Sequence, residues 1–423
     1  MARVIRKRWI TDIEAGLPRR DRRSCDYEAY VPDILAGREI GLDGSTAADV
    51  ADAERAIATL DAAAVTLADT EALARILLRA ECVASSRIEG LEVGARRLLR
   101  AEAALQLGEQ SSDVTAIEVL ANINAMSSAI QSASPGDPVT VDQLLAFHRT
   151  LLADTRLSAH AGVIRNEQNW IGGSDFNPCS AAFIPPPPEY VPGLLEDLCR
   201  FCNGDSLPAV AQAAIAHAQF ETIHPFVDGN GRTGRALIHL VLRRRGLTTR
   251  TLLPVSLVLA TWANDYIDGL DATRYRGPAA SKAAHDGVNL WVARFAAAAK
   301  RAVDDASSFE ARTEELQDDW RTELGTVRAN SATDRLLRAL PGAPLVTVNS
   351  AATLIGRSFT AVNDAIARLE ASGIVKQTNV GRRNRAFEAS AVIEAFTDLE
   401  RQLASPEGNT RTSEPARRVP RRR

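Results

Sequence analysis

The chain has 423 residues, with 50 Lys or Arg and 53 Asp or Glu, and a formal net charge of -3 at pH 7. A chain of this length is too long to fold around one compact hydrophobic core, so we expect two or three domains. The balanced charge argues against a surface covered by nucleic acid or lipid, although a local basic patch could still bind either. No apolar run approaches the roughly 20 residues that span a bilayer, so we expect a cytoplasmic protein without a membrane partner.

The five cysteines are odd in number and scattered, which does not suggest a disulfide framework. Cys199 and Cys202 form a lone C-x-x-C pair without a second pair of zinc ligands at a suitable spacing. We therefore interpret them as small apolar residues on one helix face. The histidines outside the loop described below also lack metal-ligand spacing and are expected to be structural: His148, His160, His217, His239 and His285.

Helical periodicity dominates from about residue 46 to residue 323, where Ala and Leu are frequent and β-branched runs are rare, so the fold is mostly α. One early helix ends in "VASSRIEG", residues 83 to 90, where Gly90 is a typical C-cap. Glu89 would then lie beside the negative end of the helix dipole. That position is unfavourable for a carboxylate unless a cation lies opposite.

The helical pattern is interrupted at residues 165 to 188 by "RNEQNWIGGSDFNPCSAAFIPPPP". Glycine and asparagine in the first part predict a hairpin. The four prolines that follow predict a rigid polyproline segment.

The loop "HPFVDGNGRTGR", residues 224 to 235, stands between two helical flanks. Its residues 229 to 231, Gly-Asn-Gly, can turn successive N–H groups toward one point, and the following helix adds its positive dipole end. Arg232 and Arg235 lie three residues apart on that helix and can grip the same anion. A set of backbone N–H groups that can bind one anion, together with two arginines, suggests that the ligand is a polyphosphate.

Two further side chains of this loop suggest the chemistry. Asp228 fits beside a phosphate if a divalent cation lies between them, which suggests a nucleotide with Mg²⁺. A histidine side chain ordinarily titrates near neutral pH, so His224 is suited to take a proton from an attacking hydroxyl. The loop therefore predicts phosphoryl or nucleotidyl transfer.

Beyond the loop, residues 290 to 320 predict a long charged amphipathic helix that could act as a connector or as a homodimer face. Residues 350 to 387 then read as helix, turn, helix and a basic hairpin, with the turn at Gly356. The core-facing residues expected on the second of these helices are Val362, Ile366 and Leu369.

The loop at residues 224 to 235 resembles the signature of the Fic family at every fixed position. This resemblance implies an all-α Fic core that transfers AMP from ATP to a hydroxyl side chain of a target protein or of the chain itself, with Mg²⁺. It makes His224 the general base and Asp228 the Mg²⁺ ligand, while Phe226 anchors the loop. The phosphate-binding residues that it implies are Gly229, Asn230, Gly231, Arg232 and Arg235.

Two other segments of the sequence resemble segments found in Fic family proteins. "SSRIEG" resembles an inhibitory motif made here by Ser85, Glu89 and Gly90, which implies that Glu89 pairs with Arg235 and occupies the space of the γ-phosphate. The interruption at residues 165 to 188 resembles the flap that clamps a target segment by strand addition. The flap residues expected to border the target groove are Ile184, Pro185 and Pro186.

Residues 350 to 387 resemble a winged helix-turn-helix, for which DNA and protein contacts are both open because the second helix also carries Asp364 and Glu370. DNA binding would place one group of residues near the major groove and another on phosphates. The candidate groove residues are Arg357, Thr360, Asn363 and Arg368. The candidate phosphate contacts are Arg382, Arg383 and Arg385.

The expected fold is an all-α Fic core with a small β-hairpin flap, a helical N-terminal extension and a C-terminal winged helix-turn-helix domain. The predicted boundaries are 1–115 for the extension, 116–300 for the core, 301–330 for the connector, 331–403 for the winged helix and 404–423 for a disordered basic tail. Two alternatives to an AMP transferase remain: a transcriptional regulator that senses nucleotide, and an enzyme that also removes AMP.

Overall fold

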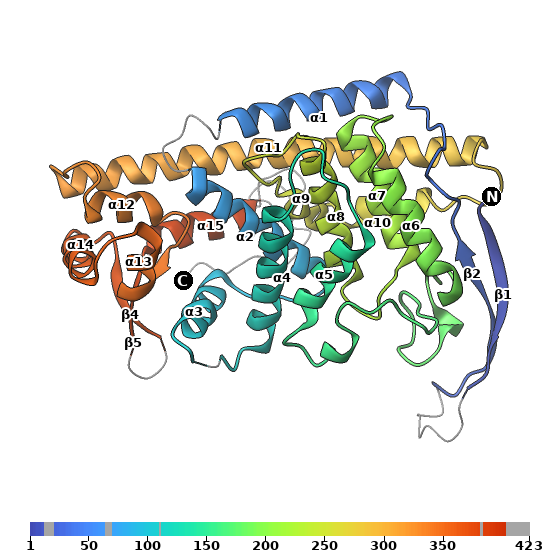
Figure 1. Ribbon diagram of the computed structural model, residues 1–423, viewed down its shortest axis with the longest axis horizontal. Coiled ribbons are helices and arrows are strands. Elements are labelled where there is room, and N and C mark those ends of the chain that lie inside the picture. Colours follow the sequence, from blue (N-terminus) through green and yellow to red (C-terminus); the bar gives the residue numbers. More distant parts are fainter. Residues whose placement is uncertain (12–20, 64–69, 110, 381–383, 403–423) are drawn as a thin grey trace. The chain divides into compact units, whose positions relative to one another are not determined.

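The computed structural model describes residues 1–11, 21–63, 70–109, 111–380 and 384–402 (Figure 1). It forms two compact units, each assembled from separate stretches of the chain. The first unit contains residues 1–54, 128–246 and 264–297, and the second contains residues 55–127, 247–263 and the chain from 298 onward. Three helices run from one unit into the other: α1 (Gly44–Ala63), α4 (Val114–Gln131) and α11 (Lys282–Leu324).

The centre of the first unit is the pair α7 and α8. Its main helices are α5 (Val141–Leu152), α6 (Val191–Cys202), α7 (Ala209–Ile223), α8 (Asn230–Arg244) and α10 (Ala263–Ala272). The alanine-rich α7 is buried on almost all sides, as expected for a helix without a polar face. Gly234 lets α8 approach α7 closely, because a Cβ there would lie 2.5 Å from Glu221 Oε1 and 2.9 Å from Phe220.

The N-terminus forms an antiparallel pair of strands, β1 (Arg3–Trp9) and β2 (Cys25–Val31), which lie side by side in Figure 1. Here the structure differs from the expected helical extension. The sequence of β1, "RVIRKRW", has no residue in the buried class, so the strand lacks the apolar face that would have shown a period of two.

A disulfide joins Cys25 at the start of β2 to Cys179 in the short helix η3 (Pro178–Ser180). The expectation from the cysteine pattern was wrong on this point, because the two partners are 154 residues apart and only the fold brings them together. Cys199 and Cys202 of α6 are buried, as predicted. Burial raises the pKa of the Cys199 thiol to about 12.

The second unit contains α2 (Thr70–Ile88), α3 (Ala95–Gln106) and α9 (Val255–Thr261), followed by a compact C-terminal region. That region runs α12 (Ala332–Ala339), β3 (Leu345–Val346), α13 (Val348–Ile355), α14 (Phe359–Ala371), β4 (Lys376–Val380), β5 (Asn384–Glu388) and α15 (Ser390–Gln402). The three strands form an antiparallel sheet in the order β3-β5-β4.

Helices α13 and α14 confirm the expected helix, turn and helix. Gly356 caps α13 with a φ of 61°, a conformation that favours glycine. The three predicted core residues of α14 are buried: Val362, Ile366 and Leu369. Among the described residues, no helix is long and apolar enough to cross a bilayer.

Candidate active site

The loop between α7 and α8 begins and ends at residues in the left-handed region. His224 caps the C-terminus of α7 with φ 50° and ψ 63°, and Gly229 caps the N-terminus of α8 with φ 75° and ψ 10°. A non-glycine residue in this conformation costs about 1 to 3 kcal/mol and needs surrounding contacts to hold it. Such strain is typical of functional positions.

Arg165 is one source of those contacts. Its Nε donates to the carbonyl oxygen of His224 at 2.8 Å, and its backbone N–H donates to that of Pro225 at 2.9 Å. Its Nη2 also donates to the carbonyl oxygen of Pro186, at 2.5 Å. Burial lowers the pKa of this guanidinium to about 10. Arg165 therefore fixes the start of the loop to the proline-rich segment, a role that sequence reasoning missed.

Asn230 closes the loop from its other end. Its Nδ2 donates to the carbonyl oxygen of Phe226 and its Oδ1 accepts from the N–H of Phe226, both at 2.8 Å. Asn169 adds a hydrogen bond of 3.0 Å to the same carbonyl oxygen. The side-chain amide of Asn230 is thus occupied within the loop, and its backbone N–H is the group that remains for a phosphate.

His148 supports the loop from α5. Its ring stacks on Phe226, which is fully buried as predicted, with 3.7 Å between ring centres. Its Nδ1 accepts from the N–H of Gly162 at 2.9 Å, so the proton is on Nε2, which lies 2.9 Å from the carbonyl oxygen of Asp228. Burial lowers the pKa of His148 to about 4, which keeps the ring neutral.

The start of α8 offers donors to an anion. The first helical hydrogen bond described runs from the N–H of Thr233 to the carbonyl oxygen of Gly229, so the N–H groups of residues 230 to 232 precede it at the positive end of the helix. The Arg232 side chain is 4% exposed. Within the described part of the chain, its Nε and Nη1 are buried and have no hydrogen-bond partner. These donors fit the oxygens of a phosphate.

The carboxylate of Asp228 is more exposed to solvent than the Arg232 side chain. Asp228 Oδ2 lies 3.3 Å from Arg232 Nη2, and the Asp228 side chain is 48% exposed. Arg235, one turn further along α8, is buried. No group of three or more His, Cys, Asp and Glu side chains within the described ranges could hold a metal. A cation at Asp228 would therefore need ligands other than a cluster of such side chains, for example water or phosphate oxygens.

The interruption at residues 165 to 188 forms the predicted hairpin, in which Ile171 pairs with Phe183. Ile184, Pro185 and Pro186 are buried beside it. Their carbonyl oxygens accept from the N–H of Tyr30 (2.9 Å), Gln168 Nε2 (2.9 Å) and Arg165 Nη2 (2.5 Å), respectively. Phe176, near the tip of the hairpin, is 45% exposed.

The three residues of the "SSRIEG" segment lie in the second unit. Ser85 is buried on α2, while Glu89 and Gly90 are exposed directly after that helix ends. Gly90 has a φ of 81°, and the N–H of Leu91 donates to the carbonyl oxygen of Ser86 at 3.0 Å. This is the predicted glycine C-cap, in the form of a Schellman motif.

The candidate DNA-contact residues of the C-terminal region differ in their contacts and in their exposure. Arg368 Nη2 donates to the carbonyl oxygens of Leu324 and Thr326, and Arg357 Nη2 donates to that of Asn330. The side chains of Thr360, Asn363 and Arg385 are exposed. Arg382 and Arg383 lie outside the described residues.

Comparison with known proteins gives matches to two family models. Residues 138–242 match the model of the Fic/DOC family, and residues 47–131 match the N-terminal model of that family. A solved structure of a Fic family protein from Desulfovibrio desulfuricans has a TM-score of 0.51 and 22% identity, covering 82% of this chain and 97% of that one. At this identity the likeness shows the fold.

Curated relatives match over shorter stretches. Protein adenylyltransferase fic-1 of Caenorhabditis elegans is 33% identical over 141 residues, or 33% of this chain and 26% of that protein. A probable protein adenylyltransferase of Aquifex aeolicus is 43% identical over 75 residues, or 18% of this chain and 23% of that protein. The match thus spans about a quarter of the length of these relatives.

Proposed function

We propose that the chain is a member of the Fic/DOC family, two models of which match parts of it, and that it is a protein adenylyltransferase that transfers AMP from ATP to a hydroxyl side chain of a target protein or of itself. The observation that carries this proposal is Arg232, on the first turn of α8 beside three backbone N–H groups. Its buried Nε and Nη1 have no hydrogen-bond partner among the residues that the structure describes. Relatives named as protein adenylyltransferases support the same reaction.

In this reaction the hydroxyl oxygen of the target forms a bond to the α-phosphorus of ATP. The bond between the α-phosphorus and the bridging oxygen breaks, and pyrophosphate leaves. His224 accepts the hydroxyl proton as general base. The N–H groups of residues 229 to 231 would hold the α-phosphate, and Arg232 and Arg235 the β- and γ-phosphates. Mg²⁺ at Asp228 would neutralise phosphate charge.

A transfer assay with labelled ATP and Mg²⁺ tests the proposal. His224→Ala should lower automodification or target modification by about 10² to 10⁴. ATP binding, measured by calorimetry, should stay close to that of the parental protein because the base acts on the hydroxyl. Transfer at the parental rate by the variant would contradict the role of His224.

The resemblance of "SSRIEG" to an inhibitory motif supports a second part of the proposal. Glu89 would pair with Arg235 in the resting protein and take the space of the γ-phosphate, so the parental activity would be low. Ser85, one turn earlier on α2, would steady this arrangement. Gly90, as the C-cap, would fix where the helix ends.

For residues 331 to 402 we propose a winged helix-turn-helix, supported by the order of its helices and by the sheet order β3-β5-β4. DNA contact would use the exposed Thr360 and Asn363 on α14, with Arg385 near phosphates. Arg368 and Arg357 already bind backbone carbonyls and would be available only in part. A mobility shift that weakens as salt increases would support DNA binding, and a salt-insensitive shift would contradict these phosphate contacts.

A further inference from the structure

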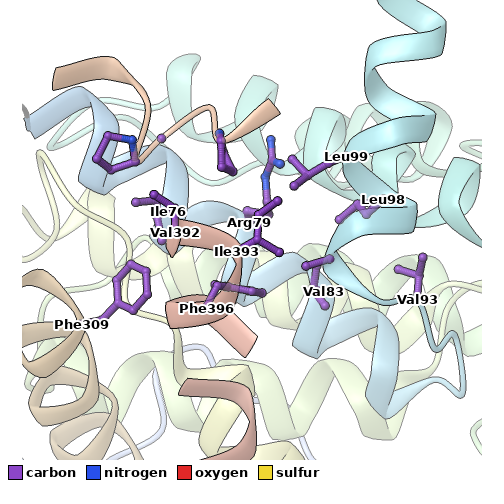
Figure 2. A pocket seen from close by; sticks show the side chains of 14 residues that line it. Ile76, Arg79, Val83, Val93, Leu98, Leu99, Phe309, Val392, Ile393 and Phe396 are labelled. Carbon is purple, nitrogen blue, oxygen red and sulfur yellow. The ribbon is translucent and has the colours of Figure 1, made fainter. Parts of the chain in front are cut away.

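A narrow pocket lies within the second unit, between α2, α3, the end of α12 and α15 (Figure 2). It contains about 490 Å³ of empty space, which includes open solvent. Its walls are mostly aliphatic and aromatic, among them Ile76, Leu98, Leu99, Ile393 and Phe396. The nucleotide-binding residues proposed above are not among those that line it.

Arg79 is the one charged residue among the described residues that line this pocket. In Figure 2 its side chain lies in the middle of the apolar ones. Its Nη2 donates to Glu102, 3.1 Å from Oε1 and 2.8 Å from Oε2. Its Nη1 is buried and has no hydrogen-bond partner in the described part of the chain. A buried donor without an acceptor is unfavourable and needs an explanation.

We propose that this pocket binds a slim, uncharged molecule with an alkyl chain and a carbonyl group. The alkyl chain would pack on the apolar walls, and the carbonyl oxygen would accept a hydrogen bond from Arg79 Nη1. Glu102 already balances the charge of Arg79. A carboxylate ligand would therefore place a net negative charge in apolar surroundings, whereas a ketone, ester or amide oxygen satisfies Nη1 without adding charge.

A binding experiment with octan-2-one as the ligand and the full chain as the receptor tests this proposal. Ligand-detected NMR should show saturable binding, and the carbonyl ¹³C resonance of the bound ketone should move to higher chemical shift because its oxygen accepts a hydrogen bond. Arg79→Met combined with Glu102→Gln removes the ion pair as a unit and keeps an apolar stem. This variant should bind about 10-fold more weakly, the effect of one lost hydrogen bond to a charged donor.

Two comparisons make the outcome decisive. Octanoate should bind the parental protein more weakly than octan-2-one, and tighter binding of octanoate would overturn the choice of an uncharged ligand. Absence of saturable ketone binding, or an unshifted carbonyl resonance in the bound state, would overturn the proposal without any variant. Equal ketone affinity in the folded double variant, checked by circular dichroism, would overturn the role of Arg79.

Discussion

Arg165 holds His224 by its main chain: the guanidinium Nε lies 2.8 Å from the carbonyl oxygen of His224, at the residue where α7 ends in a left-handed conformation. The same guanidinium reaches the carbonyl oxygen of Pro186. The position of the proposed base therefore depends on a side chain 59 residues earlier in the chain. Arg165 is a positioning residue, because it reaches the base only through the backbone.

We expect Arg165→Gln to lower the rate of AMP transfer by about 10-fold to 100-fold, because a displaced loop misaligns the base. The affinity for ATP should change by less, since Arg165 contacts no residue of the proposed phosphate site. Arg165→Lys should recover part of the rate by keeping one charged donor. Arg200→Gln, on a 63% exposed side chain, serves as the control and should leave both quantities unchanged. Equal losses of rate and affinity would indicate a structural role only.

The neutral state of His148 predicts a dependence of stability on pH. Its pKa of about 4 in the folded protein lies below its ordinary value of 6.5, so the unfolded chain binds a proton first as the pH falls. The contribution to stability is present above pH 6.5 and is lost as the pH falls toward 4. Between pH 7 and pH 5 this loss amounts to about 2 kcal/mol.

Urea unfolding at pH 7 and pH 5 checks this dependence. His148→Asn should be less stable than the parental protein at pH 7 but should lose less of its stability on going to pH 5. His160→Asn, at an exposed position, is the matched control. An identical pH dependence in the parental protein and in His148→Asn would show that this ring does not titrate as described.

Much of the site was predictable because its information is local. The loop at residues 224 to 235 carries its glycines, arginines and histidine in one stretch, and the Gly356 turn is likewise set by adjacent residues. Arg165 and His148 were not predictable as loop supports. Arg165 contacts a loop residue 59 positions further along the chain, and His148 contacts one 80 positions further along. The sequence around each of them carries no pattern that indicates such a contact.

The N-terminal hairpin was missed for a related reason. The pairing of β1 with β2 runs from Arg3 opposite Val31 to Trp9 opposite Cys25, and β1 carries charges on both faces. The disulfide of Cys25 and Cys179 adds a contact across 154 residues, which no spacing rule indicates. Periodicity identifies elements that bury one face, and β1 has no residue in the buried class.

This disulfide should contribute to stability. Replacing Cys25 and Cys179 together with serine should lower the free energy of unfolding by about 2 to 4 kcal/mol, because the unfolded chain is no longer closed into a long loop. Dithiothreitol should destabilise the parental protein by a similar amount and leave the double variant unchanged. Urea unfolding with and without the reductant measures both effects. A parental protein insensitive to reductant and equal in stability to the variant would argue against the bond in solution.

The proposed brake at Glu89 makes the sharpest prediction. If Glu89 neutralises Arg235 and excludes the γ-phosphate, Glu89→Gly should raise automodification by about 5-fold to 150-fold, the range of a typical coupling between two sites. Adding Arg235→Ala should abolish the gain, because the released arginine is what orients the donor. Ser85→Ala should act in the same direction as Glu89→Gly but less strongly, since the carboxylate itself remains.

Glu92→Gly is the matched control for Glu89→Gly, because it removes an exposed carboxylate three residues further along the chain. It should leave automodification at the parental level. All variants are compared with labelled ATP at equal protein concentration, with ATP affinity measured alongside. Release of Arg235 should also tighten ATP binding in Glu89→Gly, which a change in the target groove alone would not do. An unchanged rate in Glu89→Gly, or full activity when Arg235→Ala is added, would leave "SSRIEG" as an ordinary helix end with a glycine cap.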